Sequence, residues 1–142
     1  MPYPELKDRV VLITGGASGL GLAAGQGFAR EGAAVVLADL RADRAVAEAA
    51  CLGTRHLGPG GDVADEADVQ FLVSATLEQF GRLDVLINSA GIPDTFQPTV
   101  DQGAAEGQVA RHHRDRIARQ AEEARLVQAA DQQRHARLHA LL

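Results

Sequence analysis

A glycine-rich stretch near the start of the chain, Thr14–Gly21, constrains the fold more than any other feature. It reads Thr-Gly-Gly-Ala-Ser-Gly-Leu-Gly, follows the apolar run Val10–Ile13, and leads into a helical pattern that begins near Leu20. Glycines allow a sharp turn between a strand and a helix and let a ligand approach the backbone closely. The first amides of a helix lack intrahelical acceptors and lie at the positive end of the helix dipole. The stretch therefore predicts a buried strand, a tight turn and a helix whose N-terminus can bind phosphate.

Strand-like and helical segments alternate from this stretch to about residue 92. Apolar runs predict strands at Val10–Ile13, Ala34–Ala38 and Leu83–Ile87, and a weaker strand near Arg55–Gly58. Helical spacing predicts helices from Leu20 to about Gly32, over Ala42–Leu52, and from the N-cap Asp65 to Phe80. This alternation indicates an α/β protein, with helices on both faces of a parallel sheet. Right-handed crossovers give a Rossmann-type three-layer fold with strand order 3-2-1-4, truncated after strand 4, and ligands bind at the carboxyl ends of strands 1 and 4.

An acidic residue, Asp39, stands at the end of the second predicted strand, 18 positions after Gly21. In dinucleotide-binding βαβ units, a carboxylate about 20 residues beyond the glycine turn accepts hydrogen bonds from ribose hydroxyls. A carboxylate at this place repels a 2′-phosphate, and Ser18 brings no basic side chain into the turn that would attract one. The glycine turn and Asp39 together predict a site for NAD, with NADP disfavoured.

These features resemble those of the short-chain dehydrogenase/reductase (SDR) family. The glycine spacing Thr14-Gly15-x-x-x-Gly19-x-Gly21 is the family's own, and three further features match in order. They are Asp39, the pair Asp62-Val63, and Asn88-Ser89-Ala90-Gly91, which has serine where the family has a second asparagine. The resemblance covers residues 6 to about 100. It implies a Rossmann-type domain and an NAD(P)-dependent oxidoreductase that transfers hydride between nicotinamide and an alcohol or ketone.

The resemblance and the local chemistry assign cofactor roles to residues in all four features. The amides near Ser18, Gly19 and Leu20 are expected to meet the pyrophosphate. The resemblance implies that Asp62 and Val63 hold the adenine ring and that Ala90 and Gly91 lie against the nicotinamide-side ribose. Asn88 either belongs to this site or caps the loop after the fourth strand. The expected cofactor-binding residues are Gly15, Ser18, Gly19, Leu20, Gly21, Asp39, Asp62, Val63, Asn88, Ala90 and Gly91.

The chain departs from the family in its catalytic residues. The family's chemistry needs a tyrosine as general acid/base, a lysine four positions later that lowers the tyrosine pKa, and an upstream serine, all after strand 4. Here the single tyrosine is Tyr3 and the single lysine is Lys7, and both precede the first strand. The serines are at positions 18, 74 and 89, and none of them lies downstream of the segment Asn88–Gly91 that follows strand 4. We therefore expect no catalytic residue in this chain, and no activity from it alone.

The composition changes near residue 100, which divides the chain into a predicted NAD-binding Rossmann portion, residues 1–100, and an atypical tail, residues 101–142. The tail is rich in Ala, Arg, Gln and His and contains no aromatic residue and no strand-like run. This composition favours either a solvated helix or a disordered segment. Two histidine pairs in the tail, at 112–113 and 135–139, lack an evident third ligand, so we expect no metal site.

Three accounts of the tail remain open. In the first, residues after about 107 are out of frame, and the missing catalytic part is encoded in another frame. In the second, the chain is a non-catalytic NAD-binding or regulatory module with a genuine helical tail. In the third, the chain is an interaction protein whose Arg/His-rich tail contacts an acidic partner; the tail's near-zero net charge makes this the weakest.

Overall composition excludes several other classes. The net charge of −5 argues against nucleic acid as a partner, and no apolar run approaches the roughly 20 residues that span a bilayer. The N-terminus lacks the pattern of a secretory signal, and the single cysteine, Cys51, excludes an internal disulfide, so we expect a cytoplasmic protein. Cys51 is expected to be a small buried residue on a helix. Because strand 4 would form an uncovered apolar edge, we also expect low stability or self-association through that edge.

Overall fold

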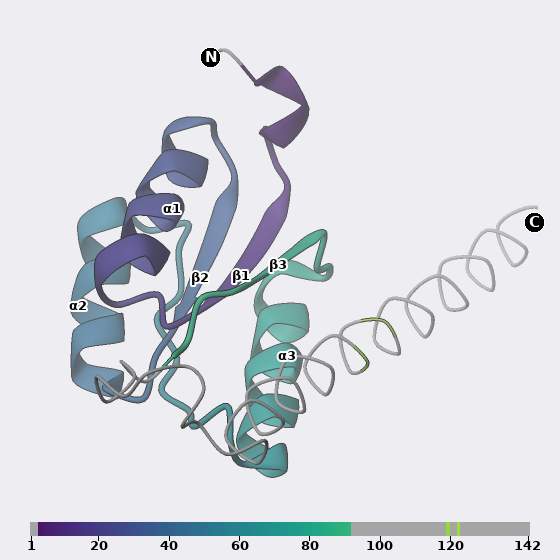
Figure 1. The fold of residues 1–142 in the computed structure, drawn as a ribbon. Helices are drawn as coiled ribbons and strands as arrows, with labels where there is room; N and C mark the ends of the chain where they lie inside the picture. Colours follow the sequence, from purple (N-terminus) through teal and green to yellow (C-terminus); the bar gives the residue numbers. More distant parts are fainter. Residues whose placement is uncertain (1–2, 92–118, 120–121, 123–142) are drawn as a thin grey trace, which may run out of the picture.

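The computed structural model of the chain describes residues 3–91, 119 and 122 and shows a parallel sheet with helices on both faces (Figure 1). Its elements are η1 (Pro4–Leu6), β1 (Val10–Thr14), α1 (Gly19–Arg30), β2 (Ala34–Ala38), α2 (Ala42–Leu52), α3 (Glu66–Phe80) and β3 (Val85–Asn88). The predicted helices and the three strong strands are confirmed, with ends that differ by at most two residues. Nearly all of the predicted tail, residues 101–142, lies outside the described residues. No helix in the described part of the chain is both long and apolar enough to cross a membrane.

The sheet has the order β2-β1-β3, and both pairings are parallel. Val11 of β1 pairs with Val35 on one side and with Val85 on the other. The strand predicted as the fourth in the chain is β3, and it lies next to β1 as expected. The predicted Rossmann-type α/β fold is therefore confirmed for the described residues.

The weak strand expected near Arg55–Gly58 is present only as two isolated parallel bridges beside β2, Val36 with Leu57 and Asp39 with Gly60. The register of these bridges calls for a hydrogen bond from the amide of residue 59 to the carbonyl of Leu37. Residue 59 is Pro59, which has no N–H, so this bond cannot form. The segment thus occupies the place of the outer strand in the order 3-2-1-4 without forming a continuous strand.

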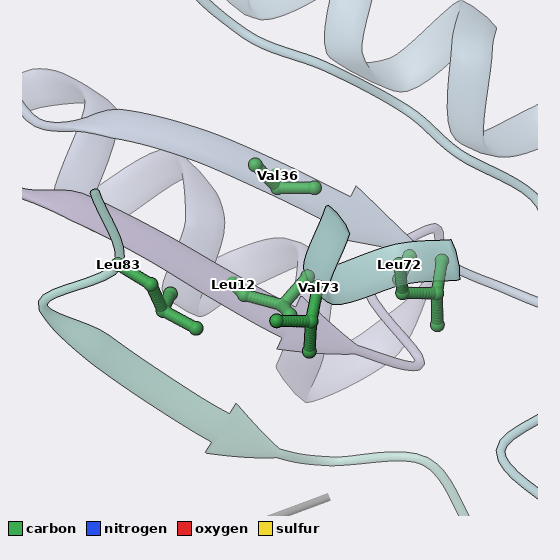
Figure 2. Packing of buried hydrophobic residues seen from close by; sticks show 6 residues of the cluster. Leu12, Val36, Leu72, Val73 and Leu83 are labelled. Atoms are coloured by element: carbon green, nitrogen blue, oxygen red, sulfur yellow. The ribbon is translucent and has the colours of Figure 1, made fainter. Parts of the chain in front are cut away.

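Two apolar clusters hold the three layers together, one on each face of the sheet. On the α3 face, Leu12 and Val36 of the sheet pack with Leu72 and Val73 of α3 and with Leu83, as Figure 2 shows. The opposite face packs against α1 and α2, with a buried cluster of Val11, Ile13, Ala33, Val35, Leu37 and Ala49. Because both faces are covered, every residue of β1 and β2 is buried.

Local signals explain where α3 begins and ends. The carboxylate of Asp65 accepts hydrogen bonds from the amides of Ala67 (2.7 Å) and Asp68 (3.1 Å), which lie in the first turn. Gly81 ends the helix in the left-handed conformation, with φ +72°. Both ends agree with the sequence prediction.

Two surface features also follow from the layers. Cys51 is exposed, which corrects the expectation of a buried residue, because Ala45 and Ala49 form the face of α2 that turns inward and Cys51 points elsewhere. The residues of β3 are only half-buried or exposed, in contrast to β1 and β2. Among the described strands, β3 lies at the edge of the sheet. The expected self-association through this edge remains a prediction.

Candidate functional site

The glycine-rich turn joins the end of β1 to the start of α1. Gly15 and Gly19 have φ of +65° and +53°, a conformation that glycine adopts without steric cost. Ser18 occupies the N-cap position of α1, but its side chain makes no capping hydrogen bond. A Cβ placed on Gly19 would meet no atom within 4 Å. The N-terminus of α1 is therefore open to a ligand and is not capped by the side chain that stands there.

Close backbone contacts fix the shape of this turn. A Cβ on Gly21 would overlap the carbonyl oxygen of Gly15, so the first turn of α1 rests directly on the end of β1. A Cβ on Gly15 would lie 2.8 Å from the Cα of Ala90. Glycine is required at both positions because backbone atoms fill the space that a side chain would take. These contacts place the backbone of the glycine turn directly against the backbone of the segment after β3.

Thr14 ties the same two segments together by hydrogen bonds. The amide of Ser89 donates to the carbonyl of Thr14 (3.2 Å), and the amide of Ala90 donates to its side-chain oxygen Oγ1 (3.3 Å). Thr14 is only 1% exposed. Asn88 and Ala90, by contrast, are exposed beside the turn, as is Gly91.

Asp39 follows β2 and reaches back to the glycine turn. Its Oδ2 accepts a hydrogen bond from the amide of Ala17 (3.1 Å), and its Oδ1 accepts one from the amide of Arg41 (3.1 Å). The Arg41 guanidinium lies close as well, with Nε 3.9 Å from Oδ1. The Asp39 side chain is 11% exposed, whereas that of Arg41 is 54% exposed. The structure thus places an acid and a cation together next to the turn.

Sequence reasoning missed Arg41. The search for a cation that could pair with a 2′-phosphate was limited to the glycine turn, which contains none. The available signal was a basic residue two positions after Asp39, but its approach to the carboxylate depends on the path of the β2–α2 connection.

Asp62 and Val63 lie beyond the carboxyl end of the bridged segment. The amide of Gly61 donates to the carbonyl of Asp39 (3.0 Å), which places Asp62 near the end of β2. The Asp62 side chain accepts a hydrogen bond from the amide of Ala64 (2.8 Å), and both predicted residues are half-buried. All of the predicted cofactor residues therefore gather at the carboxyl ends of the strands.

A separate charged cluster lies at the opposite, amino end of the sheet. Asp84 accepts hydrogen bonds from the amide of Val10 (2.9 Å) and from the guanidinium groups of Arg82 and Arg9. Burial acts to raise the pKa of Asp84, but the hydrogen bonds from Arg82, Val10 and Arg9 outweigh it and hold that pKa below its ordinary value. This cluster joins β1 to β3 and takes no part in the candidate site.

Tyr3 and Lys7 also lie at the amino end. The amide of Tyr3 donates to Glu31 Oε2 (3.1 Å) at the C-terminal end of α1, and Lys7 directly follows η1. The N-terminus of α1, at the opposite end of that helix, faces the candidate site. Tyr3 and Lys7 therefore lie at the end of the sheet opposite to the candidate site.

Comparison with known proteins supplies the family. The family model described as short chain dehydrogenase matches residues 9–136. This match continues beyond about residue 100, where the sequence analysis expected the resemblance to end. The chain belongs to the short-chain dehydrogenase family.

Individual relatives agree with this assignment. The chain is 46% identical over 110 residues to levodione reductase from Leifsonia aquatica, a match that covers 74% of this chain and 41% of the relative. It is 44% identical over 90 residues to galactitol 2-dehydrogenase from Agrobacterium fabrum, covering 63% of this chain and 35% of the relative. A crystal structure of 3-ketoacyl-(acyl-carrier-protein) reductase from Brucella melitensis complexed with NADH superposes with a TM-score of 0.70 at 33% identity, covering 83% of this chain and 49% of the other. The chain spans less than half the length of each of these proteins.

Proposed function

We propose that the chain binds a nicotinamide dinucleotide at the carboxyl ends of β1, β2 and β3, with NAD preferred over NADP. The observation that carries this proposal is the hydrogen bond from the Ala17 amide to Asp39 Oδ2, which holds a ribose-binding acid beside the open N-terminus of α1. The NADH bound to the Brucella melitensis relative supports the same ligand class.

Each part of the site suits one part of the dinucleotide. The amides at Ser18, Gly19 and Leu20, at the N-terminus of α1, would receive the pyrophosphate, which the helix dipole also favours. Gly15 packs against the backbone of Ala90, whereas Ala90 and Gly91 are exposed and a Cβ on Gly91 would meet nothing within 4 Å, which leaves room there for the nicotinamide-side ribose. Asp39 would accept from the adenosine ribose hydroxyls, and Asp62 and Val63 would border the adenine. Asn88 is exposed next to this ribose position, where its amide is able to donate or accept.

Asp39 and Arg41 act in opposite directions on the choice between NAD and NADP. A 2′-phosphate placed at Asp39 meets a carboxylate that is already held by two backbone amides. The Arg41 guanidinium would attract the same phosphate but lies 3.9 Å from the acid and is more exposed. Solvent screens an exposed cation more strongly than a largely buried anion, so the proposed preference is for NAD.

The nicotinamide, when bound, would supply hydride transfer to or from an alcohol or ketone, which is the chemistry that the family resemblance implies for a full-length member. This chain's residues bind and orient the dinucleotide, and its sequence has no tyrosine or lysine after β3. We therefore propose that the chain is the cofactor-binding part of such an oxidoreductase and does not turn over substrate by itself. The alternative is a non-catalytic NAD-binding or regulatory module with a genuine helical tail, and a tail that is helical by circular dichroism would favour it.

Ser18→Asp tests the site without disturbing the fold. Aspartate is a favoured N-cap residue, so the variant should be at least as stable as the wild type. Its charge would face the pyrophosphate, and like charges about 4 Å apart repel by roughly 1–4 kcal/mol near a protein surface, so NAD affinity should fall about tenfold or more. Ser74→Asp, at an exposed position on α3, makes the same charge change away from the site.

The readout is calorimetric titration of the wild type and both variants with NAD and NADP. We expect weaker binding by Ser18→Asp alone, and tighter binding of NAD than of NADP by the wild type. Equal NAD affinity in Ser18→Asp and Ser74→Asp would show that the pyrophosphate does not sit at α1. A wild type that binds neither dinucleotide would refute the proposed function.

A further inference from the structure

His56 makes an unusual contact with the buried strand β2. Its ring nitrogen Nδ1 accepts a hydrogen bond from the amide of Val35 (3.1 Å). Val35 is fully buried, whereas His56 is half-buried. The bridge between Val36 and Leu57 sets a register in which the Val35 amide would otherwise meet the carbonyl of Arg55. The imidazole of His56 thus takes the place of a backbone acceptor in the pairing of β2.

This contact exists only while the ring is neutral. An imidazole nitrogen accepts a hydrogen bond only when it carries no proton, so the proton of neutral His56 is on Nε2. Protonation of Nδ1 would set two N–H donors against each other, and the buried Val35 amide would lose its partner. Burial, and secondarily the charge of Arg55, hold the pKa of His56 below its ordinary value of 6.5.

The charges around the ring do not favour the imidazolium. Arg55, the neighbouring cation, is itself paired with Asp8 at 3.0 Å, and both side chains are exposed. β2 presents apolar residues on this side, and α2 with the turn after it borders His56 through a shallow hollow without charged residues. The hollow is lined by Val46, Ala49, Ala50, Gly53, Thr54 and His56 itself.

The segment that begins at His56 leads directly to the candidate site. The amide of Leu57 donates to the carbonyl of Val35 (3.0 Å), and the amide of Leu37 donates to the carbonyl of Leu57 (2.8 Å). Two more bonds follow, from the amide of Asp39 to the carbonyl of Pro59 (3.3 Å) and from the amide of Gly61 to the carbonyl of Asp39 (3.0 Å). Pro59 removes one rung from this pairing, so the bond from Val35 to His56 is one of five that hold the segment to β2 and Asp39. Two residues after Gly60, the bridge partner of Asp39, the chain reaches Asp62.

We propose that His56 is a pH-sensitive latch: protonation of its ring releases residues 56–61 from β2. The release displaces Asp62 and Val63, which would border the adenine, and so weakens binding of the dinucleotide. The effect on affinity rests on the proposed function, whereas the release of the segment does not. The latch is closed above about pH 6.5 and opens as the pH falls from 6.5 towards the lower pKa of the closed state.

His56→Asn separates the proton from the hydrogen bond. The Asn Oδ1 can accept from the Val35 amide as Nδ1 does, but it does not titrate. His56→Gln provides a second non-titrating acceptor in case Asn is too short, and His139→Asn is a matched change outside the described residues. NAD affinity and amide hydrogen exchange of the full chain are measured at pH 7.5 and at pH 5.5, with exchange expressed as protection factors so that intrinsic rates cancel.

Between pH 7.5 and pH 5.5, the wild type and His139→Asn should lose more NAD affinity than His56→Asn does. This loss has an upper limit, because protonation shifts the equilibrium between closed and open states by at most tenfold for each unit by which the pKa of His56 differs between them. Protection of the Val35 and Leu57 amides should fall over the same range in the wild type and stay constant in His56→Asn. Losses of affinity that arise from other titrating groups are shared by all the proteins and cancel in the comparison.

Two results would overturn the latch. One is the same pH dependence of affinity in the wild type and in both His56 variants. The other is unchanged protection of Val35 and Leu57 in the wild type at pH 5.5. If the wild type binds no NAD at pH 7.5, the proposed function fails, and the amide protection still decides whether the latch exists.

Discussion

Three glycines of α1 provide a graded test of how the helix packs on the sheet. A Cβ on Gly27 would meet nothing within 4 Å. A Cβ on Gly25 would lie 2.7 Å from Leu37 Cδ2, the end of a side chain. A Cβ on Gly21 would overlap the backbone carbonyl oxygen of Gly15. The same Gly→Ala change therefore meets open space at Gly27, the movable end of a side chain at Gly25, and backbone at Gly21.

These surroundings set both the sign and the size of each effect on the free energy of unfolding. Alanine in a helix is favoured over glycine by about 0.5–1 kcal/mol, so Gly27→Ala should stabilise by that amount. At Gly25 this gain is offset by overpacking of roughly 1–3 kcal/mol, reduced because Leu37 can shift its Cδ2. At Gly21 the backbone of β1 or the start of α1 must move, so a net loss near or above 2 kcal/mol is expected. Each 1 kcal/mol corresponds to about 4–8 °C in Tm for a domain of roughly 60–100 residues and to about 2–4 °C for one of roughly 150–250.

Urea denaturation of the full chain, followed by circular dichroism, measures all three variants against the wild type. The expected order of stability is Gly27→Ala, wild type, Gly25→Ala and Gly21→Ala. Gly21→Ala should also weaken NAD binding because it displaces the glycine turn, whereas Gly27→Ala should not. If Gly21→Ala proved as stable as Gly27→Ala, the close contact between α1 and the end of β1 would be refuted.

Two further predictions concern α3 and the amino end of the sheet. Asp65→Ala removes the acceptor for the amides of Ala67 and Asp68 and should lower the free energy of unfolding by about 1 kcal/mol, measured by urea denaturation; no change would contradict the N-cap. Because the pKa of Asp84 is held below its ordinary 3.8, the carboxylate stabilises the fold above about pH 3.8, and this contribution is lost as the pH falls through the lower folded-state pKa. Asp84→Asn should therefore be less stable than the wild type at neutral pH, with a gap that closes in acid; a gap that did not change with pH would contradict this assignment.

Local sequence signals predicted the elements that depend on neighbouring residues alone. The apolar runs of β1 and β2, the Asp65 cap and Gly81 specify their elements through side-chain pattern and backbone conformation, and the structure agrees at each. The glycine turn was predicted for the same reason. The weak strand near residue 57 was harder to predict because its pairing is interrupted by Pro59 and depends on the neighbouring β2.

The composition of the candidate site came from the sequence, but its internal contacts did not. Spacing identified Asp39 as an acid at the end of a strand. The spacing does not show that its carboxylate would bond to Ala17 inside the turn or that Arg41 would lie beside it. Those contacts join residues that are far apart in the chain or depend on how a loop folds back.

The sequence by itself determined the order of strands and helices, the glycine turn and the positions of the acids that follow the strands. These features depend on periodicity, residue shape and backbone freedom, all of which are local. Only the tertiary structure decided that Gly15 lies against Ala90, that Thr14 bonds to the segment after β3, and that His56 supplies an acceptor to β2. Such contacts arise when the sheet assembles and bring distant backbone within hydrogen-bonding or van der Waals distance, which no local pattern encodes.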